Sequence, residues 1–276
     1  MDSPRQRTEA PIFYDTPSDM TLKEKVCKKI VTTNNISVLY SMVSKDGSYL
    51  LLGLDKGFMV VSLPDGSIKC QRSLRGGIGK IAWIDNSNIF ALVGGGRFPF
   101  EGRTKIVIWD EKLGKRITTI SYHSDMLINN LAFSKDYLVV ALGPNPGSMQ
   151  KENLNYIMVY AISGKKSNFE HIDKLATIRN PRGVFSLCEK NLETYIVYPY
   201  LKNQEFHTGN LEIRNIAKPG QTINLKAHTN IIWQVSFSRS GNYIATCSRK
   251  GTMIRIWETL SGNMACEIRR GFQKEN

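Results

Sequence analysis

The sequence predicts an all-β protein made of repeated four-stranded sheets. Short runs rich in β-branched and aromatic residues, such as 105–109 and 156–160, recur along the chain, and these residue types favour strands. Glycine-containing turns separate the runs, and no long stretch has the period of a helix. One segment also repeats, because residues 44–50 align without a gap on residues 238–244. These three observations indicate a fold assembled from copies of one sheet.

The repeat length identifies the architecture. Taking Tyr49, Ile89, Tyr137, Tyr195 and Tyr243 as markers of successive repeats, the differences between their numbers are 40, 48, 58 and 48. A period of roughly 40 to 50 residues is typical of the blades of a β-propeller. We therefore expect a propeller over residues 31–276, after a mostly disordered polar tail over residues 1–30. The expected blades are 35–72, 73–119, 120–177, 178–225 and 226–271.

Composition limits the class of protein and of partner. A chain of 276 residues with 41% hydrophobic and 22% charged residues is typical of a soluble globular protein. No apolar run approaches the ~20 residues that span a bilayer, and the N-terminus lacks the apolar core of a secretory signal, so we expect a cytoplasmic protein. Lysine and arginine outnumber the acids by 37 to 24. The net charge of +13 favours an anionic partner, either a membrane surface or nucleic acid.

The sequence does not predict an enzyme or a bound cofactor. The five cysteines form no C-x-x-C pair, so we expect reduced thiols that fill the core, without a zinc site or a disulfide framework. His123, His171 and His207 stand alone, without the neighbours of a catalytic triad. Gly94-Gly95-Gly96 lacks the Gly-Lys-Ser/Thr of a phosphate-binding loop and is interpreted as a turn.

The last repeat resembles a WD repeat. His228 precedes its first strand, and Trp257 follows Ile256 at the end of its third. WD repeats usually have Ser-x-Asp-Gly-Thr between these two points, whereas this chain has Ser248-Arg249-Lys250-Gly251-Thr252. A cation therefore stands where the repeat normally has a carboxylate, which suits a site for phosphate.

Four further motifs occur along the chain: Ala-Leu-Val-Gly-Gly-Gly at residues 91–96, Asn-Pro-Arg-Gly at 180–183, Tyr198-Pro199, and Ile-Arg-Arg-Gly at 268–271. They resemble motifs of the PROPPIN family, the phosphoinositide-binding propellers of autophagy. That family has Phe-Arg-Arg-Gly, Ala-Leu-Val-Gly-Gly-Gly, Asn-Pro-Lys-Gly and Tyr-Pro, so isoleucine replaces phenylalanine in the arginine motif of this chain. The resemblance covers about residues 35–271 and implies a seven-bladed architecture, of which about five blades are present. Three explanations stay open: a truncated product, a five-bladed ring, or a propeller that a partner completes.

The resemblance implies a lipid-headgroup site on the last blade. Arg269 would hold a phosphate with its forked guanidinium, Lys250 would act as a point charge, and Arg270 would face a neighbouring pocket. The remaining expected site residues are His228, Ser248 and Thr252 as hydrogen-bond donors, with Arg255 at the edge. In the alternative interpretation His228 and Ser248 make the structural hydrogen bonds of a WD repeat, and the arginines are solvated.

The implied function is that of a recruiting scaffold on membranes. The resemblance implies binding to phosphatidylinositol 3-phosphate or the 3,5-bisphosphate on preautophagosomal, endosomal or vacuolar membranes, with autophagy or trafficking proteins as partners. The alternative is a WD-repeat scaffold that binds only proteins. Nucleic acid is not expected as a partner, because the sequence shows no aromatic platform of the kind that stacks single-stranded bases.

Overall fold

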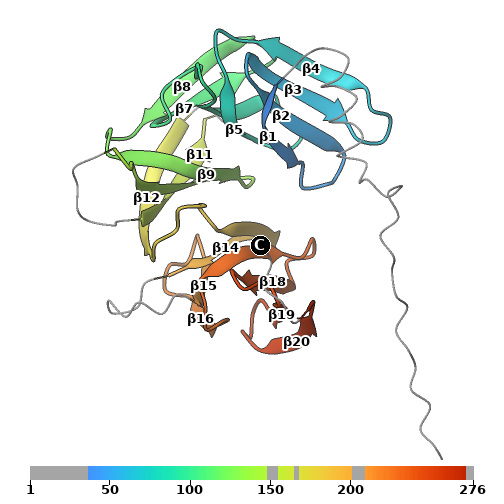
Figure 1. Cartoon of the computed structure of the whole chain (residues 1–276), viewed down its shortest axis with the longest axis vertical. Coiled ribbons are helices and arrows are strands. Elements are labelled where there is room, and N and C mark those ends of the chain that lie inside the picture. The colour runs from blue at the N-terminus through green and yellow to red at the C-terminus, as the bar shows by residue number, and fades with distance from the viewer. Residues whose placement is uncertain (1–36, 148–154, 165–167, 201–208, 272–276) are drawn as a thin grey trace, which may run out of the picture.

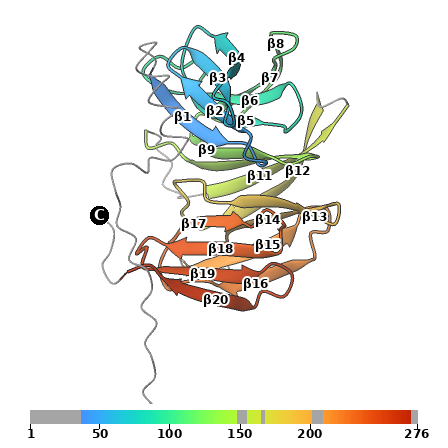
Figure 2. The same cartoon turned by 90° about the vertical axis from the view of Figure 1, so that its right-hand side faces the viewer.

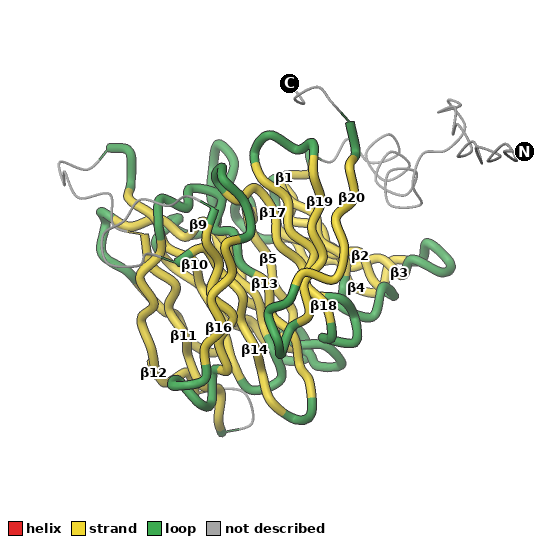
Figure 3. The backbone as a smooth tube through the Cα atoms, turned by 90° about the horizontal axis from the view of Figure 1, so that it is seen from below, coloured by secondary structure: helices red, strands yellow, loops and turns green. Residues whose placement is uncertain are grey.

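The structure, a computed structural model, describes residues 37–147, 155–164, 168–200 and 209–271. The predicted tail over residues 1–30 lies outside this part of the chain. The described residues contain strands and loops and no helix (Figure 3). Their twenty strands form five four-stranded antiparallel sheets, which confirms the predicted all-β fold class. None of the described residues belongs to a helix that could cross a membrane.

Each sheet is a meander in which strands adjacent in sequence pair with each other. The first sheet contains β1 (Val38–Val43), β2 (Tyr49–Leu54), β3 (Gly57–Ser62) and β4 (Ile68–Ser73), and the second contains β5 (Ile78–Trp83), β6 (Ile89–Gly94), β7 (Lys105–Asp110) and β8 (Lys115–Ser121). The third contains β9 (Met126–Phe133), β10 (Tyr137–Pro144), β11 (Asn155–Ser163) and β12 (Asn168–Thr177). The fourth contains β13 (Ser186–Lys190), β14 (Glu193–Pro199), β15 (Asn210–Asn215) and β16 (Thr222–Lys226), and the fifth contains β17 (Ile232–Phe237), β18 (Tyr243–Ser248), β19 (Met253–Glu258) and β20 (Met264–Arg269).

The five sheets follow an arc in chain order. In Figure 1 the first sheet lies at the upper right, the third at the left and the fifth below, with β1, β5 and β9 on the inner side of the arc. In Figure 2 the fifth sheet lies in front of the fourth, and the two pack on each other through a shared cluster that includes Leu211, Ile213 and Ile244. This arrangement, in which each sheet packs on the next around a centre, is that of propeller blades.

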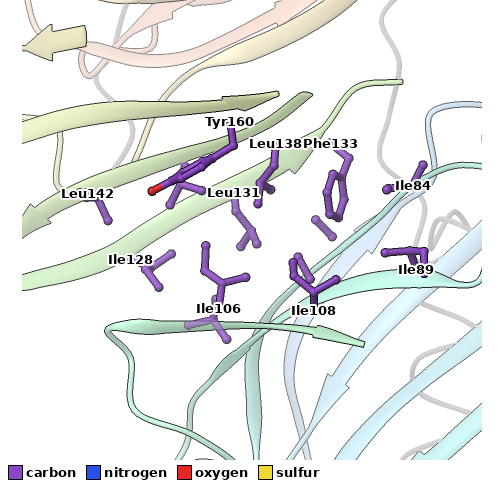
Figure 4. Packing of buried hydrophobic residues seen from close by; sticks show 14 residues of the cluster. Ile84, Ile89, Ile106, Ile108, Ile128, Leu131, Phe133, Leu138, Leu142 and Tyr160 are labelled. Atoms are coloured by element: carbon purple, nitrogen blue, oxygen red, sulfur yellow. The ribbon is translucent and has the colours of Figure 1, made fainter. Parts of the chain in front are cut away.

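The core lies between neighbouring sheets. Between the second and third sheets, Ile106 and Ile108 of β7 meet Leu131 and Phe133 of β9 and Leu138 of β10 (Figure 4). Exposed fractions of these five side chains are 3% or less. Burying an aliphatic or aromatic side chain of this size stabilises a fold by about 1.5–3 kcal/mol. Apolar residues on both faces of inner strands such as β3 and β6 therefore hold neighbouring sheets together.

The triple-glycine turn at residues 94–96 is structural. A methyl group added at Gly94 would overlap the backbone oxygen of Glu101, and one added at Gly95 would overlap the Cα atom of Gly79. Gly96 has a φ of 75°, which side chains disfavour. Close approach of three backbone segments explains why this motif needs glycine.

The Asn-Pro-Arg-Gly motif at residues 180–183 joins three sheets. The Asn180 side chain donates to the carbonyl of Val184 over 3.0 Å and accepts the Val184 amide over 2.7 Å. Asn130 of β9 donates to the carbonyl of Gly183 over 2.9 Å. The Arg182 guanidinium lies 4.0 Å from the ring centre of Trp233 in β17. One short loop before β13 therefore contacts the third and fifth sheets as well as its own.

The two terminal sheets differ in how their outer faces are covered. Leu50 and Met59 in the first sheet have exposed fractions of 0%. In the fifth sheet Met264 and Ile268 are 52% and 51% exposed. Ile268 pairs with Ile254 on the face opposite to the one that packs on the fourth sheet through Ile244 and Trp257. The face of the fifth sheet turned away from the fourth is therefore apolar and open.

The cysteines depart in part from the expectation of core thiols. None of those in the described residues forms a disulfide, and Cys188 is buried, Cys70 and Cys247 are half-buried, and Cys266 is exposed. Cys266 lies on β20, the edge strand of the open fifth sheet, which explains its exposure. Cys27 lies outside the described residues.

Candidate functional site

The adjacent arginines lie at the end of β20, beside the turn that joins β18 to β19. Arg269 is opposite Met253 in the strand register. The backbone N–H of Arg270 donates to the carbonyl of Thr252 over 2.9 Å, and its Nε donates to the carbonyl of Gly251 over 2.8 Å. Gly251 has a φ of 70°, a backbone conformation that glycine adopts without steric cost and that permits the tight turn between β18 and β19. The structure thus brings together the predicted arginines and the Lys-Gly-Thr turn.

The two arginines are on opposite faces of the sheet. Residues directly opposite each other in an antiparallel pair share a face, and Arg255 faces Glu267 in the register. Arg255 reaches the fourth sheet, since its Nη1 donates to the carbonyl of Ala227 over 2.6 Å. Arg269, two residues after Glu267, therefore lies on the face that packs on the fourth sheet, and Arg270 lies on the open face.

His228 is held inside the blade. Its Nε2 lies 3.0 Å from the hydroxyl oxygen of Thr246, and the same oxygen accepts the indole N–H of Trp257 over 3.0 Å. Burial, and secondarily the charge of Arg255, lower the pKa of His228 below its usual 6.5. The imidazole is therefore neutral at pH 7, and it can donate or accept a hydrogen bond but adds no charge.

The two hydroxyl residues of the predicted site are less accessible than expected. Ser248 and Thr252 have exposed fractions of 6% and 7%. Their carbonyls are occupied by the turn and by β20, because Ser248 accepts the Gly251 amide over 2.9 Å and Thr252 accepts the Arg270 amide. Both residues shape the turn. Lys250 between them is exposed, as is its neighbour Arg249.

Arg255 is engaged within the blade. Its Nε donates to Oε2 of Glu267 over 2.6 Å, in addition to the bond that it makes to Ala227. The side chains of Arg255 and Glu267 are 29% and 35% exposed, so solvent screens this ion pair in part. The carboxylate closest in sequence to the arginine pair is thus already neutralised. Among the described residues, the cationic side chains exposed at this end of the blade are those of Arg249, Lys250, Arg269 and Arg270.

Sequence reasoning missed three residues of this region. Thr246 holds both His228 and Trp257, but it looks like any polar residue in an alternating strand. Glu267 pairs with Arg255 across the sheet, and its position two residues before Arg269 was the available signal. Arg249 adds a cation to the turn and was visible in the motif itself.

The described residues contain no group of three or more His, Cys, Asp or Glu side chains that could hold a metal ion. The features that this end of the fifth sheet offers are exposed guanidinium and ammonium groups next to backbone turns. Such groups recognise anions, phosphate above all, through charge-assisted hydrogen bonds.

Comparison with known proteins agrees with the fold and the repeat. Residues 218–258 match the family described as "WD domain, G-beta repeat". The chain is similar to SVP1-like protein 2 of Schizosaccharomyces pombe, with 25% identity over 244 residues that cover 88% of this chain and 60% of that protein. It is also similar to SVP1-like protein 2 of Neurospora crassa, with 28% identity over 245 residues covering 86% of this chain and 49% of that protein. The chain spans about half to two thirds of the length of these curated relatives.

Solved structures share the fold. Kluyveromyces lactis Hsv2 matches with a TM-score of 0.66 and 20% identity, over 87% of this chain and 66% of that one. KlAtg21, in a complex with the coiled-coil of AgAtg16, matches with a TM-score of 0.63 and 16% identity, over 86% of this chain and 72% of that one.

Proposed function

We propose, from the premise that this chain is a PROPPIN-like propeller, that it binds phosphoinositides on membranes. The premise rests on the sequence motifs, on the SVP1-like relatives and on the fold shared with Hsv2. In this proposal the chain recognises phosphatidylinositol 3-phosphate or the 3,5-bisphosphate through the end of its fifth blade. Its role is that of a recruiting scaffold in autophagy or in endosomal and vacuolar traffic.

The observation that carries the proposal is the contact between Arg270 and the β18–β19 turn. Its two hydrogen bonds, to Gly251 and to Thr252, hold the end of β20 next to Lys250. Arg269 is the neighbouring residue, so two guanidinium groups and one ammonium group are kept near one edge. Because Glu267 is paired with Arg255, that carboxylate does not cancel their charge.

In the proposed complex Arg269 binds a headgroup phosphate with two parallel N–H bonds, and Lys250 adds a point charge. His228 is neutral, so it contributes at most a hydrogen bond. Each charge-assisted bond contributes about 1.5–3 kcal/mol. A few such bonds correspond to an affinity in the micromolar range at best. Stable residence on a membrane then needs a second contact, to which the net charge of +13 contributes on anionic surfaces.

The proposal includes protein partners and a location. KlAtg21, which shares this fold, forms a complex with the coiled-coil of AgAtg16. We therefore propose an autophagy protein as a partner of this chain. The proposed location is the cytoplasmic side of preautophagosomal, endosomal or vacuolar membranes, where the chain binds reversibly from solution.

The first test is flotation of the purified chain with liposomes. One set contains phosphatidylinositol 3-phosphate, and the other contains phosphatidylserine at matched charge. We expect wild type to float with the first set, and the double variant Arg269→Thr/Arg270→Thr to lose most of that binding. The matched control is Lys115→Thr/Arg239→Thr, which removes the same charge from two exposed positions away from the site and is expected to float as wild type does.

Equal flotation with both liposome sets would leave only non-specific electrostatic attraction, and the headgroup proposal would be wrong. Equal losses in the double variant and its charge-matched control would lead to the same conclusion. Circular dichroism of each variant establishes that the blades are intact before binding is compared.

A second candidate is a protein scaffold without lipid binding. The hydrogen bond between His228 and Thr246, and the ion pair between Arg255 and Glu267, favour it because they occupy two predicted site residues within the blade. This candidate predicts that folded wild type ignores the phosphoinositide, whereas it still captures a protein partner.

A further inference from the structure

A pocket lies on the inner side of the arc, among the first four sheets and away from the fifth. It is a cavity of about 250 Å³ lined by the inner strands β1, β5, β9 and β13 and by the loops that follow β1 and β5. Figure 1 shows β1, β5 and β9 along the inner side of the arc. Its walls include the aromatic residues Tyr40, Trp83, Phe133 and Phe185, and its charged lining residues are Lys45 and Asp85.

Asp85 is a half-buried carboxylate without a bonded partner. Within the described part of the chain, no hydrogen bond or ion pair is made to its side chain, although many other acids of this protein have one. Burial raises the pKa of Asp85, the charge of Lys45 lowers it, and the charges of Asp46 and Glu189 raise it. The pocket thus contains an anionic group that burial and neighbouring acids leave poorly compensated.

Lys45 does not neutralise Asp85 directly. Its ammonium lies 3.1 Å from Oε1 of Glu189, and that same oxygen accepts the backbone N–H of Lys135 over 2.8 Å. Lys45 is therefore bonded to the acid at the rim, and the carboxylate of Asp85 stays available to a cation that enters the pocket.

The size of the cavity limits the ligand. Pockets that hold drug-sized molecules have volumes of about 300–1,000 Å³, so a cavity of about 250 Å³ suits one side chain or a small amine. The apolar walls can cover an aliphatic stem, as the methylene chains of lysine and arginine lie along apolar surfaces elsewhere in proteins. Such walls with a carboxylate match a charged group carried on a methylene chain.

We propose that this pocket binds an alkylammonium or guanidinium group, with its charge paired to Asp85 and its aliphatic stem against the aromatic walls. The group comes either from a lysine or arginine side chain of a partner peptide or from a free small amine. The site is separate from the phosphate site, because the pocket is built from the first four sheets and the arginine pair lies on the fifth.

The test is a titration of the whole chain with small probes of graded charge. The probes are Nα-acetyl-lysine amide, Nα-acetyl-arginine amide, butylammonium, the uncharged Nα-acetyl-norleucine amide and the anionic Nα-acetyl-glutamate amide. Binding is followed by the indole N–H resonance of Trp83 in NMR spectra, assigned with Trp83→Phe. We expect saturable shifts with cationic probes and weaker ones with the norleucine probe. A response to the amino-acid amides without a response to butylammonium identifies the peptide source.

Two substitutions are expected to act in opposite directions. Asp85→Asn keeps the shape of the side chain but removes its charge. It is expected to weaken the binding of the cationic probes at least about tenfold and to leave the binding of the norleucine probe unchanged. Lys45→Gln removes the competing cation and is expected to strengthen the binding of the cationic probes. Glu170→Gln, an exposed carboxylate on the outer strand β12, is the control and is expected to change nothing.

Three results would overturn the proposal. They are equal affinity of Asp85→Asn and wild type for the cationic probes, no binding of any cationic probe to wild type at millimolar concentration, and preferred binding of the glutamate probe. If Asp85→Asn does not fold, Lys45→Gln decides, because unchanged or weaker cation binding in that variant contradicts the proposed pairing. None of these results depends on lipid binding.

Discussion

The imidazole Nε2 of His228 and the hydroxyl oxygen of Thr246 lie 3.0 Å apart, and the indole of Trp257 donates to the same oxygen. One threonine thus links the loop before β17 to two strands of the fifth sheet. The hydroxyl also donates to the carbonyl of Arg255 over 3.3 Å. The region next to the proposed phosphate site is therefore organised by a side chain that need not contact a ligand.

Replacing Thr246 with valine tests this role. Valine keeps the shape, but it leaves the buried Trp257 N–H and the His228 ring without their shared partner. We expect the free energy of unfolding to fall by about 1–3 kcal/mol, measured by urea denaturation. Thr246→Ser retains the hydroxyl, and its free energy of unfolding is expected to fall by clearly less than that of Thr246→Val. Equal losses in both variants would show that packing of the methyl group, and not the hydrogen bonds, stabilises the site.

The pH dependence of stability is expected to report on His228. Its pKa is lowered in the folded state, so the unfolded chain binds the proton more readily. The contribution of the neutral histidine is present above pH 6.5, the unfolded value, and is lost as pH falls through the folded pKa. Between pH 7.5 and 5.5 wild type should therefore lose more stability than His228→Gln. Parallel stability profiles for the two proteins would contradict this expectation.

The pair Arg255 and Glu267 is suited to a double-mutant cycle with Arg255→Met and Glu267→Gln. Both side chains are partly exposed, so we expect a coupling energy of about 0.5–1 kcal/mol. Arg255→Met is expected to lower the free energy of unfolding more than Glu267→Gln does, because it also removes the hydrogen bond to the carbonyl of Ala227. A coupling energy near zero in urea denaturation would mean that the ion pair contributes nothing to stability.

Gly94 is expected to tolerate no side chain. In Gly94→Ala the new methyl group overlaps the backbone of Glu101, which cannot move like a flexible side chain. We expect a loss of about 3 kcal/mol or more, or failure to fold. Gly102→Ala in the same loop makes only an ordinary contact with Thr104 and serves as the control, with a change within about 0.5 kcal/mol. The midpoints of thermal melting of the two variants are compared with that of wild type. Similar midpoints for Gly94→Ala and Gly102→Ala would contradict the prediction that Gly94 tolerates no side chain.

Thiol reactivity is expected to separate the cysteines. Burial raises the pKa of Cys70 to about 12 and that of Cys188 to about 11, and the thiolate is the reactive form. Cys266 is exposed on β20. At pH 8 we expect rapid alkylation of Cys266 and slow alkylation of the other two, followed by mass spectrometry of peptides. In 8 M urea these three should react at similar rates. Fast labelling of Cys188 in the native protein would argue against the packing of β13.

The sequence was sufficient for the fold because a repeated sheet leaves a periodic trace. Strand runs and the glycines of turns recur at the spacing of a blade, so local chemistry and global architecture agree. The resemblance grouped Arg269 with the Lys250 turn and assigned Arg270 to a neighbouring pocket, whereas in the structure Arg270 is the arginine that bonds to Gly251 and Thr252 in that turn. The family resemblance supplied the functional hypothesis, which periodicity alone could not.

Other features depended on contacts that sequence does not show. Serine and threonine of a turn were expected to be accessible donors, but Ser248 and Thr252 are buried, with Ser248 paired to Ile232 of β17 and Thr252 bonded to the amide of Arg270. The stacking of Arg182 on Trp233 joins residues 51 positions apart, the difference between 233 and 182. The carboxylate of Asp85, which has no bonded partner in the described part of the chain, could be recognised only after four sheets had been brought around it.

The loop at residues 180–184 has a consequence for how the molecule opens. The amide of Val184 is bonded to Asn180, and Asn130 from the third sheet holds the adjacent carbonyl. Opening of this loop therefore also breaks a contact with the third sheet, and Arg182 extends the linkage to the fifth. Hydrogen exchange at Val184 should accordingly be among the slowest in the chain, and the last three sheets should unfold as one cooperative unit rather than blade by blade.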